Sequence, residues 1–481
     1  MNLACYNCRS LSSEPRLQEL EEELLKIKWD VIGLSEVRRK GEGQIQLKSG
    51  HIFYYRGTEN GKNSGVCFII NKRWKDNILE VDSSSDRVAR LVLRLSKRNK
   101  LQIIQVYAPT ASHPDEEIED FYDEIKQMNG KGKHYVKIIM GDFNARIGAK
   151  EKNETSVGKF GHGKRNERGD MLVDFAEAEK FYIMNSFFKK KSSRKWTWRH
   201  PNGGKYESDY ILSNKQHNVE NCNVLNRFNT GSDHRLVRGR LHLNTRLERR
   251  KLMRTTKSVD LKNLKEQHGT FEMELKNQFS VLENLTKEET DISETNRQIT
   301  KIIMETAARI GGYVIRKTEK KITEKTRQLM GKRRMMKRSK ENITSNIEYA
   351  ELCKTIRKCF TEDIRKYNCG LVKTALENNK SLRNAKQQLT NGRKHIFALK
   401  KEDGTVTRDR EEILARVEEF YKKLYARDTA PTVKTTYEVT NEVPEILKEE
   451  VAYAIRNMKK GKAPGEDGIT IDILRGSWRS Y

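Results

Sequence analysis

The stretch VKIIMGDFNARIG, residues 136–148, joins a short apolar segment directly to a polar loop. Its apolar part, 136–140, predicts a buried strand. The loop that follows carries Asp142 and Asn144, at a position where side chains can meet a substrate. The same succession of an apolar strand and a polar loop recurs through the first part of the chain, so this stretch indicates how that part folds.

Helices and strands alternate around this stretch. Apolar residues at helical spacing predict helices that begin near Pro15 and near residue 118, and short apolar or alternating segments predict strands at 31–35, 89–95 and 101–106. Elements mixed in this order predict a layered α/β domain over residues 1–243.

Polar side chains stand at the ends of several predicted strands. They supply carboxylates, amides, one imidazole and one phenol, from Asn7, Glu36, Tyr107, Asp142, Asn144, Asp209, Asp233 and His234. Such a set suits a hard divalent cation and an anionic substrate, because Mg²⁺ prefers oxygen ligands. Each residue alone is more typical of a turn, a cap or packing. Only the ordered set predicts a site.

Six short motifs carry a family resemblance: YNCRSL, GLSEVR, VYAPT, GDFNARIG, SDYIL and GSDHR, in this order. Together they resemble the endonuclease/exonuclease/phosphatase superfamily, and within it the apurinic/apyrimidinic-endonuclease-like domain of non-LTR retrotransposons. The resemblance implies a deoxyribonuclease-like, four-layer sandwich of two β-sheets flanked by helices, with the site at one end, followed here by a mainly helical C-terminal region.

The resemblance also implies a metal cofactor. Glu36 would be the principal ligand of Mg²⁺, with Mn²⁺ as an alternative, and Asn7 and Asp233 would support it. In the DNA-repair members of the superfamily, an acid stands two residues after the first Asn, where this chain has Arg9. Efficient cleavage at abasic sites is therefore not expected.

The remaining residues of the set would move protons and hold the phosphate. The resemblance implies that Asp142, oriented by Asn144, deprotonates the attacking water, and that Tyr107 holds a phosphate oxygen or assists the leaving group. His234, held by Asp209, would stabilise the charge on the phosphate. The expected products end in a 3′-hydroxyl and a 5′-phosphate.

A basic and aromatic stretch at 189–199 stands beside this set. Thr110 and Thr197 fall where the family contacts the DNA backbone, and Trp198 and Arg199 predict a groove contact. A charged loop on a strand explains the stretch equally well. Trp196 alternates with Trp198, so one of the two is expected to be buried. Ser208 stands where the family has an apolar residue, which costs about 1–3 kcal/mol if its hydroxyl lacks a partner.

Charge indicates the class of partner. The 481 residues carry 95 Lys and Arg against 67 Asp and Glu, a formal charge of +28. Residues 301–400 alone hold 26 basic and 9 acidic side chains. Such a concentration attracts polyanions, of which nucleic acid is the commonest, although a solvated helical surface remains the alternative. We expect DNA as the partner, with RNA as a further partner of the basic helices, and no known protein partner.

The second half of the chain predicts helices, because no proline lies between Pro201 and Pro431. We expect a basic helical connector over 244–430, whose central run KRRMMKR (332–338) fits nuclear import, nucleic-acid binding or a solvated face. The motif GKAPGEDGIT (461–470) resembles the start of non-LTR reverse transcriptases, which predicts a truncated fingers fragment at 431–481. The chain ends before a palm motif, so no polymerase activity is expected.

Several classes are not expected. No apolar run approaches the roughly 18 residues of a membrane span, and the N-terminus lacks a secretory pattern. Seven cysteines at irregular spacing predict neither a disulfide framework nor a zinc site. The sequence therefore predicts a Mg²⁺-dependent DNA endonuclease of the nucleus, with the cytoplasm as a further location. Two alternatives stay open: a degenerate copy that only binds nucleic acid, and a phosphoesterase of the same fold acting on a lipid or inositol phosphate.

Overall fold

The computed structural model describes residues 1–481 except 61–63, 97–98, 133, 135, 152, 243–258, 286–291, 313–320, 337–342, 380, 391, 402, 426–445, 460–466 and 476–481. The chain forms two compact units. Unit 1 comprises 1–253 and 320–426, and unit 2 comprises 254–319 and 427–481. Part of the predicted helical connector thus folds together with the N-terminal residues.

The first sheet of unit 1 has eight strands in the order β14-β15-β1-β2-β5-β4-β3-β16. β1 and β2 run parallel, and the other neighbours described in this sheet are antiparallel. The strands are β1 (Asn2–Asn7), β2 (Val31–Ser35), β3 (Glu42–Leu47), β4 (Ile52–Arg56), β5 (Val66–Ile70), β14 (Val219–Leu225), β15 (Leu236–Leu241) and β16 (Gly392–Lys394).

The second sheet has six strands in the order β10-β13-β9-β8-β7-β6, with β8 and β9 parallel. These strands are β6 (Ile78–Ser83), β7 (Val88–Arg94), β8 (Lys100–Tyr107), β9 (Val136–Asp142), β10 (Tyr182–Ile183) and β13 (Asp209–Ser213). Two small hairpins lie outside both sheets: β11 (Trp198–Arg199) with β12 (Lys205–Tyr206), and β17 (Leu399–Lys400) with β18 (Val406–Thr407).

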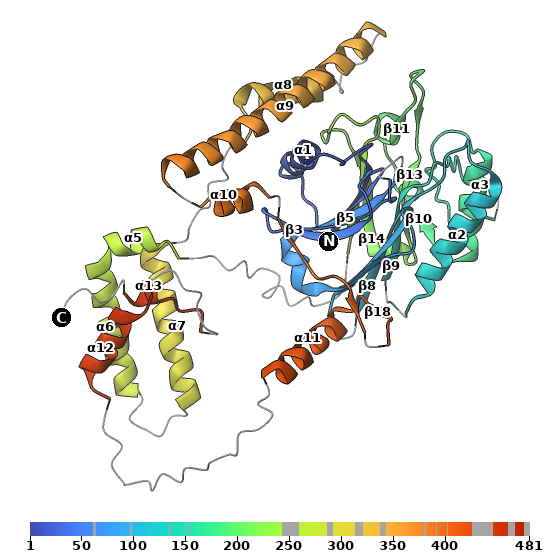
Figure 1. Ribbon diagram of the computed structural model, residues 1–481. Coiled ribbons are helices and arrows are strands. Elements are labelled where there is room, and N and C mark those ends of the chain that lie inside the picture. The colour runs from blue at the N-terminus through green and yellow to red at the C-terminus, as the bar shows by residue number, and fades with distance from the viewer. Residues whose placement is uncertain are drawn as a thin grey trace. The chain divides into compact units, whose positions relative to one another are not determined.

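The two sheets pack face to face, and helices cover their outer faces (Figure 1). Between the sheets lies an apolar core to which Phe68 and Ile103 belong, both fully buried. A second core joins the smaller sheet to α2 (Asp115–Gly130) and α3 (Glu167–Ala178), and a third joins the larger sheet to α1 (Glu14–Leu24). Each fully buried side chain of this kind stabilises the fold by about 1.5–3 kcal/mol. The predicted four-layer α/β sandwich is confirmed.

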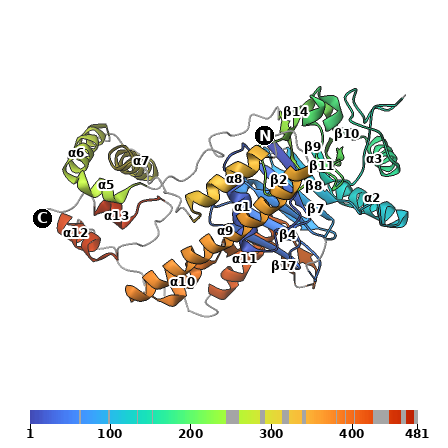
Figure 2. The same ribbon diagram turned by 90° about the horizontal axis from the view of Figure 1, so that it is seen from above.

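The C-terminal part of unit 1 is mainly helical and packs on the sandwich. It contains α8 (Glu324–Met336), α9 (Ile343–Glu377), α10 (Leu382–Leu389) and α11 (Arg410–Tyr425). Seen from above, α8 and α9 cross the side of the sandwich that α1 covers (Figure 2). The short strand β16 then pairs with β3 at the edge of the larger sheet.

Unit 2 is a small helical assembly. Its helices are α5 (Leu261–Glu266), α6 (His268–Leu285), α7 (Ile292–Gly311), α12 (Lys448–Asn457) and α13 (Ile471–Leu474). Phe271, Ala307 and Ile473 meet in its core, so the segment after the GKAPGEDGIT motif packs on the helices of the connector. Residues 461–466 of that motif lie outside the described residues. Among the helices described in both units, none has the length and apolar character needed to cross a membrane.

Candidate active site

The ends of five strands place the predicted site residues at one edge of the sandwich. Asn7 is the last residue of β1, and Glu36 directly follows the neighbouring parallel strand β2. In the other sheet, Tyr107 and Asp142 are the paired last residues of the parallel strands β8 and β9. Asp209, the first residue of the antiparallel strand β13, pairs with Asp142. Strand pairing therefore brings these residues to one end of both sheets.

Side-chain contacts connect the two sheets at this end. The Asn7 Nδ2 amide donates to Glu36 Oε1 and to Asp142 Oδ2, each at 2.9 Å. The Tyr107 hydroxyl donates to Glu36 Oε1 at 3.2 Å. Burial first, and then the charges of Glu36 and Asp142, raise the pKa of Tyr107 well above its usual range. Tyr107 is therefore a hydrogen-bond donor at neutral pH.

His234 lies between two buried aspartates. Its Nδ1 contacts Asp209 Oδ2 at 2.9 Å, and its Nε2 lies 3.8 Å from Asp142 Oδ2. Burial acts to lower the pKa of His234, but Asp209 and Asp142 outweigh it and raise this pKa to about 9. The imidazole is thus a cation at neutral pH, and Asp209 fixes its orientation.

Asp142 is buried at the centre of the site. Burial and the neighbouring Asp209 carboxylate raise the pKa of Asp142 to about 7, against the opposing effect of His234. The backbone N–H of Asn144 donates to Asp142 Oδ1 at 3.1 Å, and the Asn144 side chain donates to the Ala108 carbonyl at 2.8 Å. A carboxylate with a pKa near neutrality is suited to accept a proton from water.

Four residues around the site have left-handed backbone conformations without being glycine. The φ angles are 60° at Arg9, 54° at Glu36, 52° at Arg38 and 49° at Asn144. Such conformations are unfavourable for residues with a β-carbon and persist where the surroundings hold them, commonly at functional sites. In this chain they lie one to three residues after the ends of β1, β2 and β9.

The donor set fits a divalent cation. The ligand atoms of Asp142, Asp209 and His234 lie within 4.8 Å of one another, and the buried Asp209 Oδ1 has no hydrogen-bond partner within the described structure. The Asp142 and Asp209 carboxylates could therefore bind a metal, whereas His234 could join them only in its neutral form, because a protonated imidazole has no free lone pair. The predicted ligands are connected to this cluster. The Asn7 side chain links Glu36 to Asp142 by hydrogen bonds, and Asp233 directly precedes His234 in the chain. Arg38 contacts Glu36 at 2.9 Å, and Arg9 contacts Asp233 at 3.6 Å.

The residues expected to contact DNA lie in different surroundings. Thr197 is fully buried, and its hydroxyl accepts the backbone N–H groups of Ser208 and Asp209 at 2.9 and 3.1 Å. Thr197 thus supports the strand that carries Asp209. Thr110 is half-buried after β8 and contacts Ser112 at 2.8 Å.

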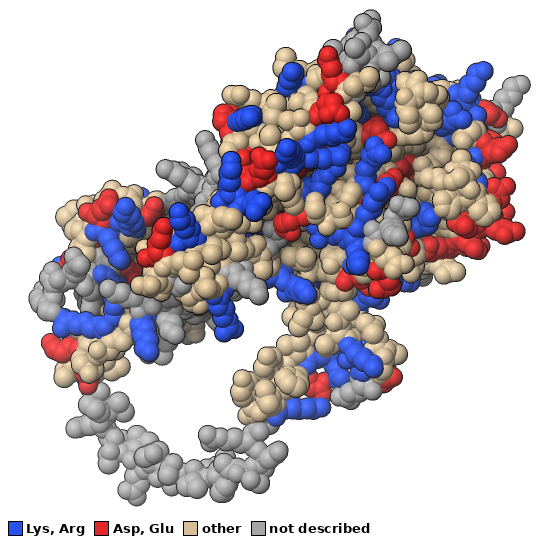
Figure 3. Space-filling model, turned by 45° about the horizontal axis from the view of Figure 1, so that its top comes forward, with Lys and Arg blue, Asp and Glu red and all other residues tan. Residues whose placement is uncertain are grey.

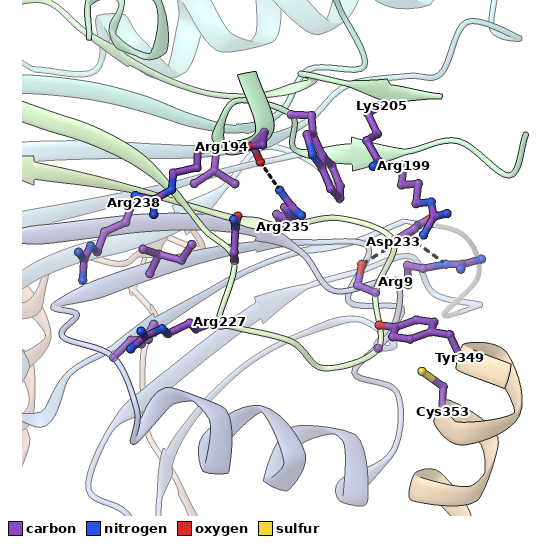
Figure 4. Close-up of a pocket in the computed structure, with 18 of the residues that line it drawn as sticks. Arg9, Arg194, Arg199, Lys205, Arg227, Asp233, Arg235, Arg238, Tyr349 and Cys353 are labelled. Carbon is purple, nitrogen blue, oxygen red and sulfur yellow. Dashed lines mark hydrogen bonds and ion pairs between the residues drawn. The ribbon is translucent and has the colours of Figure 1, made fainter. Parts of the chain in front are cut away.

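Trp198 and Arg199 stand at the rim of the site. As the alternation predicts, Trp196 is buried while Trp198 is half-buried, and the Trp198 ring lies 6.3 Å from that of His234. Arg199 faces the surface and lines a groove next to Asp233 (Figure 4).

This groove, which we call the basic groove, has a volume of about 1340 Å³. Of the described residues that line it, eleven are Lys or Arg, and Asp233 is the one acid. Trp196 forms part of its wall, with the Arg235 guanidinium carbon 3.2 Å from the ring centroid. Blue side chains also gather toward the upper middle of the space-filling view (Figure 3). The surface beside the site is therefore strongly cationic.

Two supporting residues were missed by sequence reasoning. The Ser232 hydroxyl donates to the Asn7 carbonyl at 2.8 Å and accepts the His234 backbone N–H at 3.0 Å, so it joins the two ends of the site. The sequence signal that could have indicated this role of Ser232 is its place in the GSDHR motif. Arg38, in the GLSEVR motif, contacts Glu36, and only its proximity to Glu36 in the sequence could have indicated this contact.

Comparison with known proteins identifies the class. Residues 2–234, just under half of the chain, match the sequence model of the Endonuclease/Exonuclease/phosphatase family, so this part of the chain is similar to that family. Members of the family are generally hydrolases, which agrees with the acids and the imidazole gathered at the strand ends.

Curated relatives add detail. The chain is 30% identical over 249 residues to "Craniofacial development protein 2" of Tragulus javanicus, which covers 51% of this chain and 43% of the relative. The Bos taurus protein of that name is also 30% identical over 249 residues, covering 51% of this chain and 41% of the relative. A shorter match, 34% identical over 98 residues, covers 18% of this chain and 7% of the "Transposon TX1 uncharacterized 149 kDa protein" of Xenopus laevis. The chain thus spans less than half the length of these relatives.

Solved structures are similar to about half of the chain. The endonuclease domain of TRAS1, a telomere-specific non-LTR retrotransposon, is 14% identical with a TM-score of 0.35, covering 51% of this chain and 99% of that domain. The AP endonuclease LMAP of Leishmania major is 11% identical with a TM-score of 0.37, covering 50% of this chain and 88% of that structure.

Proposed function

We propose that this chain is a DNA endonuclease that requires Mg²⁺ and leaves a 3′-hydroxyl end. The observation that carries the proposal is the continuous set of contacts from Glu36 through Asn7 and Asp142 to His234 and Asp209 at one end of the sandwich. A buried base with a pKa near 7 and a buried cation meet there, as hydrolysis of a phosphodiester requires.

The roles follow from the positions. Asp142 would take a proton from the attacking water, His234 would donate a hydrogen bond to the phosphate, and Tyr107 would hold a phosphate oxygen or assist the leaving group. Glu36, with Asn7 and Asp233, would hold Mg²⁺ or Mn²⁺, and the cation when bound would neutralise the phosphate charge.

The basic groove supports nucleic acid over a lipid or inositol phosphate. It reaches from Arg9 and Asp233, beyond the end of β1, to Lys28, which precedes the start of the parallel strand β2. Strands of five to six residues span about 17–20 Å at 3.3 Å per residue. That distance corresponds to about five to six phosphates of one DNA strand, whereas a single headgroup needs one such contact.

Nicking of supercoiled plasmid by the full chain tests the proposal. We expect relaxation with Mg²⁺, none with chelator, and ends that a polymerase can extend. Asp142→Asn should abolish relaxation and leave metal-free binding to DNA intact. The exposed Asp120→Asn, a matched change on α2, should behave as wild type. Binding without Mg²⁺-dependent nicks would instead establish a degenerate binding protein, and hydrolysis of inositol phosphates without nicks would establish the other alternative.

Arg9 leads to a more specific test of the proposed function. It occupies the position where DNA-repair members carry a metal-binding acid, and it is paired with Asp233. We therefore expect duplexes with one abasic site to be cleaved no faster than intact duplexes of the same sequence. Preferential cleavage at the abasic site would contradict the assignment to the retrotransposon branch.

The transposon relative supports a retrotransposon origin, and we propose residues 431–481 as a fingers fragment without polymerase activity. A primer-extension assay with the full chain tests this, and any incorporated nucleotide would contradict it. We also propose that the chain acts in the nucleus, where genomic DNA is available. Microscopy of the tagged full chain tests this proposal, and exclusion from the nucleus would refute it.

A further inference from the structure

Helix α9 belongs to the predicted connector, yet it lines the same groove as Asp233 of the candidate active site. Among the lining residues are Ala350, Cys353, Lys354 and Arg357, at helical spacings of three, four and seven positions. Residues at these spacings share one face of a helix. Figure 4 shows Tyr349 and Cys353 on α9 beside the loop that carries Asp233. One face of α9 is therefore a wall of the basic groove.

A buried ion pair fixes α8 and α9 on the sandwich. Arg333 of α8 contacts Glu19 of α1 at 2.7 Å, and their side chains are 1% and 2% exposed. Burial acts to lower the pKa of Arg333, but Glu19 outweighs it, so the guanidinium stays charged. Both members of a buried pair must stay in contact, because burying either charge without its partner costs free energy of folding.

The docked helices also hold the loop before Asp233. Arg333 donates to the Asn229 carbonyl at 2.7 Å, and the Asn229 side chain donates to the Tyr349 hydroxyl at 3.1 Å. A β-carbon on Gly231 would lie 3.5 Å from Cys353 Sγ. The groove wall and the loop of the candidate metal ligand are thus in direct contact.

The cations of α9 extend the positive surface of the sandwich. Lys354 and Arg357 are exposed and face the groove that Arg9 also lines. Partial burial, followed by the charge of Arg16 on α1, lowers the pKa of Arg357. Cations that gather on two walls of one groove match the repeated phosphates of a nucleic-acid backbone.

We infer that α9 is the second wall of the DNA groove: duplex DNA held for cleavage contacts phosphates through Lys354 and Arg357 as well as through the endonuclease domain. The inference rests on the proposed function, which makes DNA the substrate. It assigns a nucleic-acid contact to a segment that follows the family domain in the chain. The connector then acts in substrate binding, beyond joining two domains.

The test uses the full chain and a 25-base-pair duplex, with binding measured by fluorescence anisotropy in chelator at several salt concentrations. Each phosphate contact contributes about 0.9 to the slope of log K against log salt, so Lys354→Gln/Arg357→Gln should lower that slope by about 1.8. The matched control is Lys358→Gln/Arg365→Gln, two exposed cations of α9 outside the groove, and it should keep the wild-type slope.

The outcomes test the inference about α9 and the proposed endonuclease function separately. An unchanged slope in Lys354→Gln/Arg357→Gln, or an equal change in the control, overturns the inference. A change seen only with a single-stranded or RNA oligonucleotide also overturns it. Plasmid nicking by wild type, measured in parallel with Mg²⁺, tests the proposed function separately: no nicks would refute that function whatever the slope. Circular dichroism checks that both variants are folded.

Discussion

Asp209 and Asp142 together keep His234 charged, and Asp209 makes the closer contact. Asp209 holds Nδ1 at 2.9 Å, and this contact is a main reason why the pKa of His234 rises to about 9. If the imidazolium stabilises the phosphate, nicking should fall as pH rises through about 9. Asp209→Asn removes the charge, lowers the pKa of His234, and should move this fall to lower pH. The measurement is the nicking rate against pH for both proteins.

An unchanged alkaline fall in Asp209→Asn would contradict the role of His234 as a charged donor. Asp120→Asn serves again as the control, because it removes an exposed carboxylate away from the site.

Glu207 predicts a second pH effect, on stability. Burial raises the pKa of Glu207 to about 7, although the Asn185 amide donates to it at 3.0 Å. The raised pKa means that the folded state favours the protonated acid, so stability is lost as pH rises from about 4.5 through 7. Glu207→Gln should remove this loss, a difference on the order of 2–3 kcal/mol at pH 8. Urea unfolding at pH 5 and pH 8 measures it.

Exposed Glu116→Gln on α2 provides the matched control and should keep the wild-type pH dependence. A Glu207→Gln protein that loses as much stability as wild type between pH 5 and 8 would show that another group is responsible.

Individual residues show which contacts can be predicted from the sequence and which cannot. That Glu36, Asp142 and Asp209 lie close together could be expected from the sequence, because each stands next to an apolar strand. Ser208 was expected to destabilise the strand if it lacked a partner, but its hydroxyl donates to Asp209 at 3.2 Å. Arg333 was seen as one cation of a basic run, whereas it is buried against Glu19. A contact between residues so distant in the chain leaves no local signal.

At the scale of elements, the long strands and amphipathic helices of the sandwich follow their sequence periodicity. The predicted strand 136–140 is β9, which extends to Asp142 because that residue still pairs with Tyr107 and Asp209. Strands of two or three residues, such as β16 and β17, were not predicted. So few residues show no alternation, and their pairing depends on partners elsewhere in the fold.

The docking of α8 gives a prediction for this element. Arg333→Met should leave Glu19 buried with Arg16, at 3.8 Å, as its remaining ion-pair partner among the described residues, and should destabilise the packing of α8 and α9 by about 3–5 kcal/mol. Hydrogen exchange of the amides in 324–336 and 347–377 measures the effect as faster exchange. Lys332→Met, at an exposed neighbouring position, is the control. Equal exchange in both variants would contradict the structural role of the ion pair.

At the scale of the whole molecule, the site and the groove belong to unit 1, while unit 2 has its own core. Phe271 is fully buried in that core. Phe271→Ala should destabilise unit 2 by about 3–5 kcal/mol, seen as faster proteolysis within 259–311, and should leave plasmid nicking unchanged. The exposed Met273→Ala is the matched control for the same helix. Loss of nicking in Phe271→Ala alone would show that the activity depends on unit 2.

The pairing of β16 with β3 has a consequence for shortened proteins. β3 is covered along its outer side only because residues 392–394 return to it from far along the chain. A protein cut after residue 243 would lack that cover and would present free backbone N–H and C=O groups to other molecules. Such a fragment should self-associate as its concentration rises, with larger species in light scattering, even though it keeps every side chain of the candidate active site.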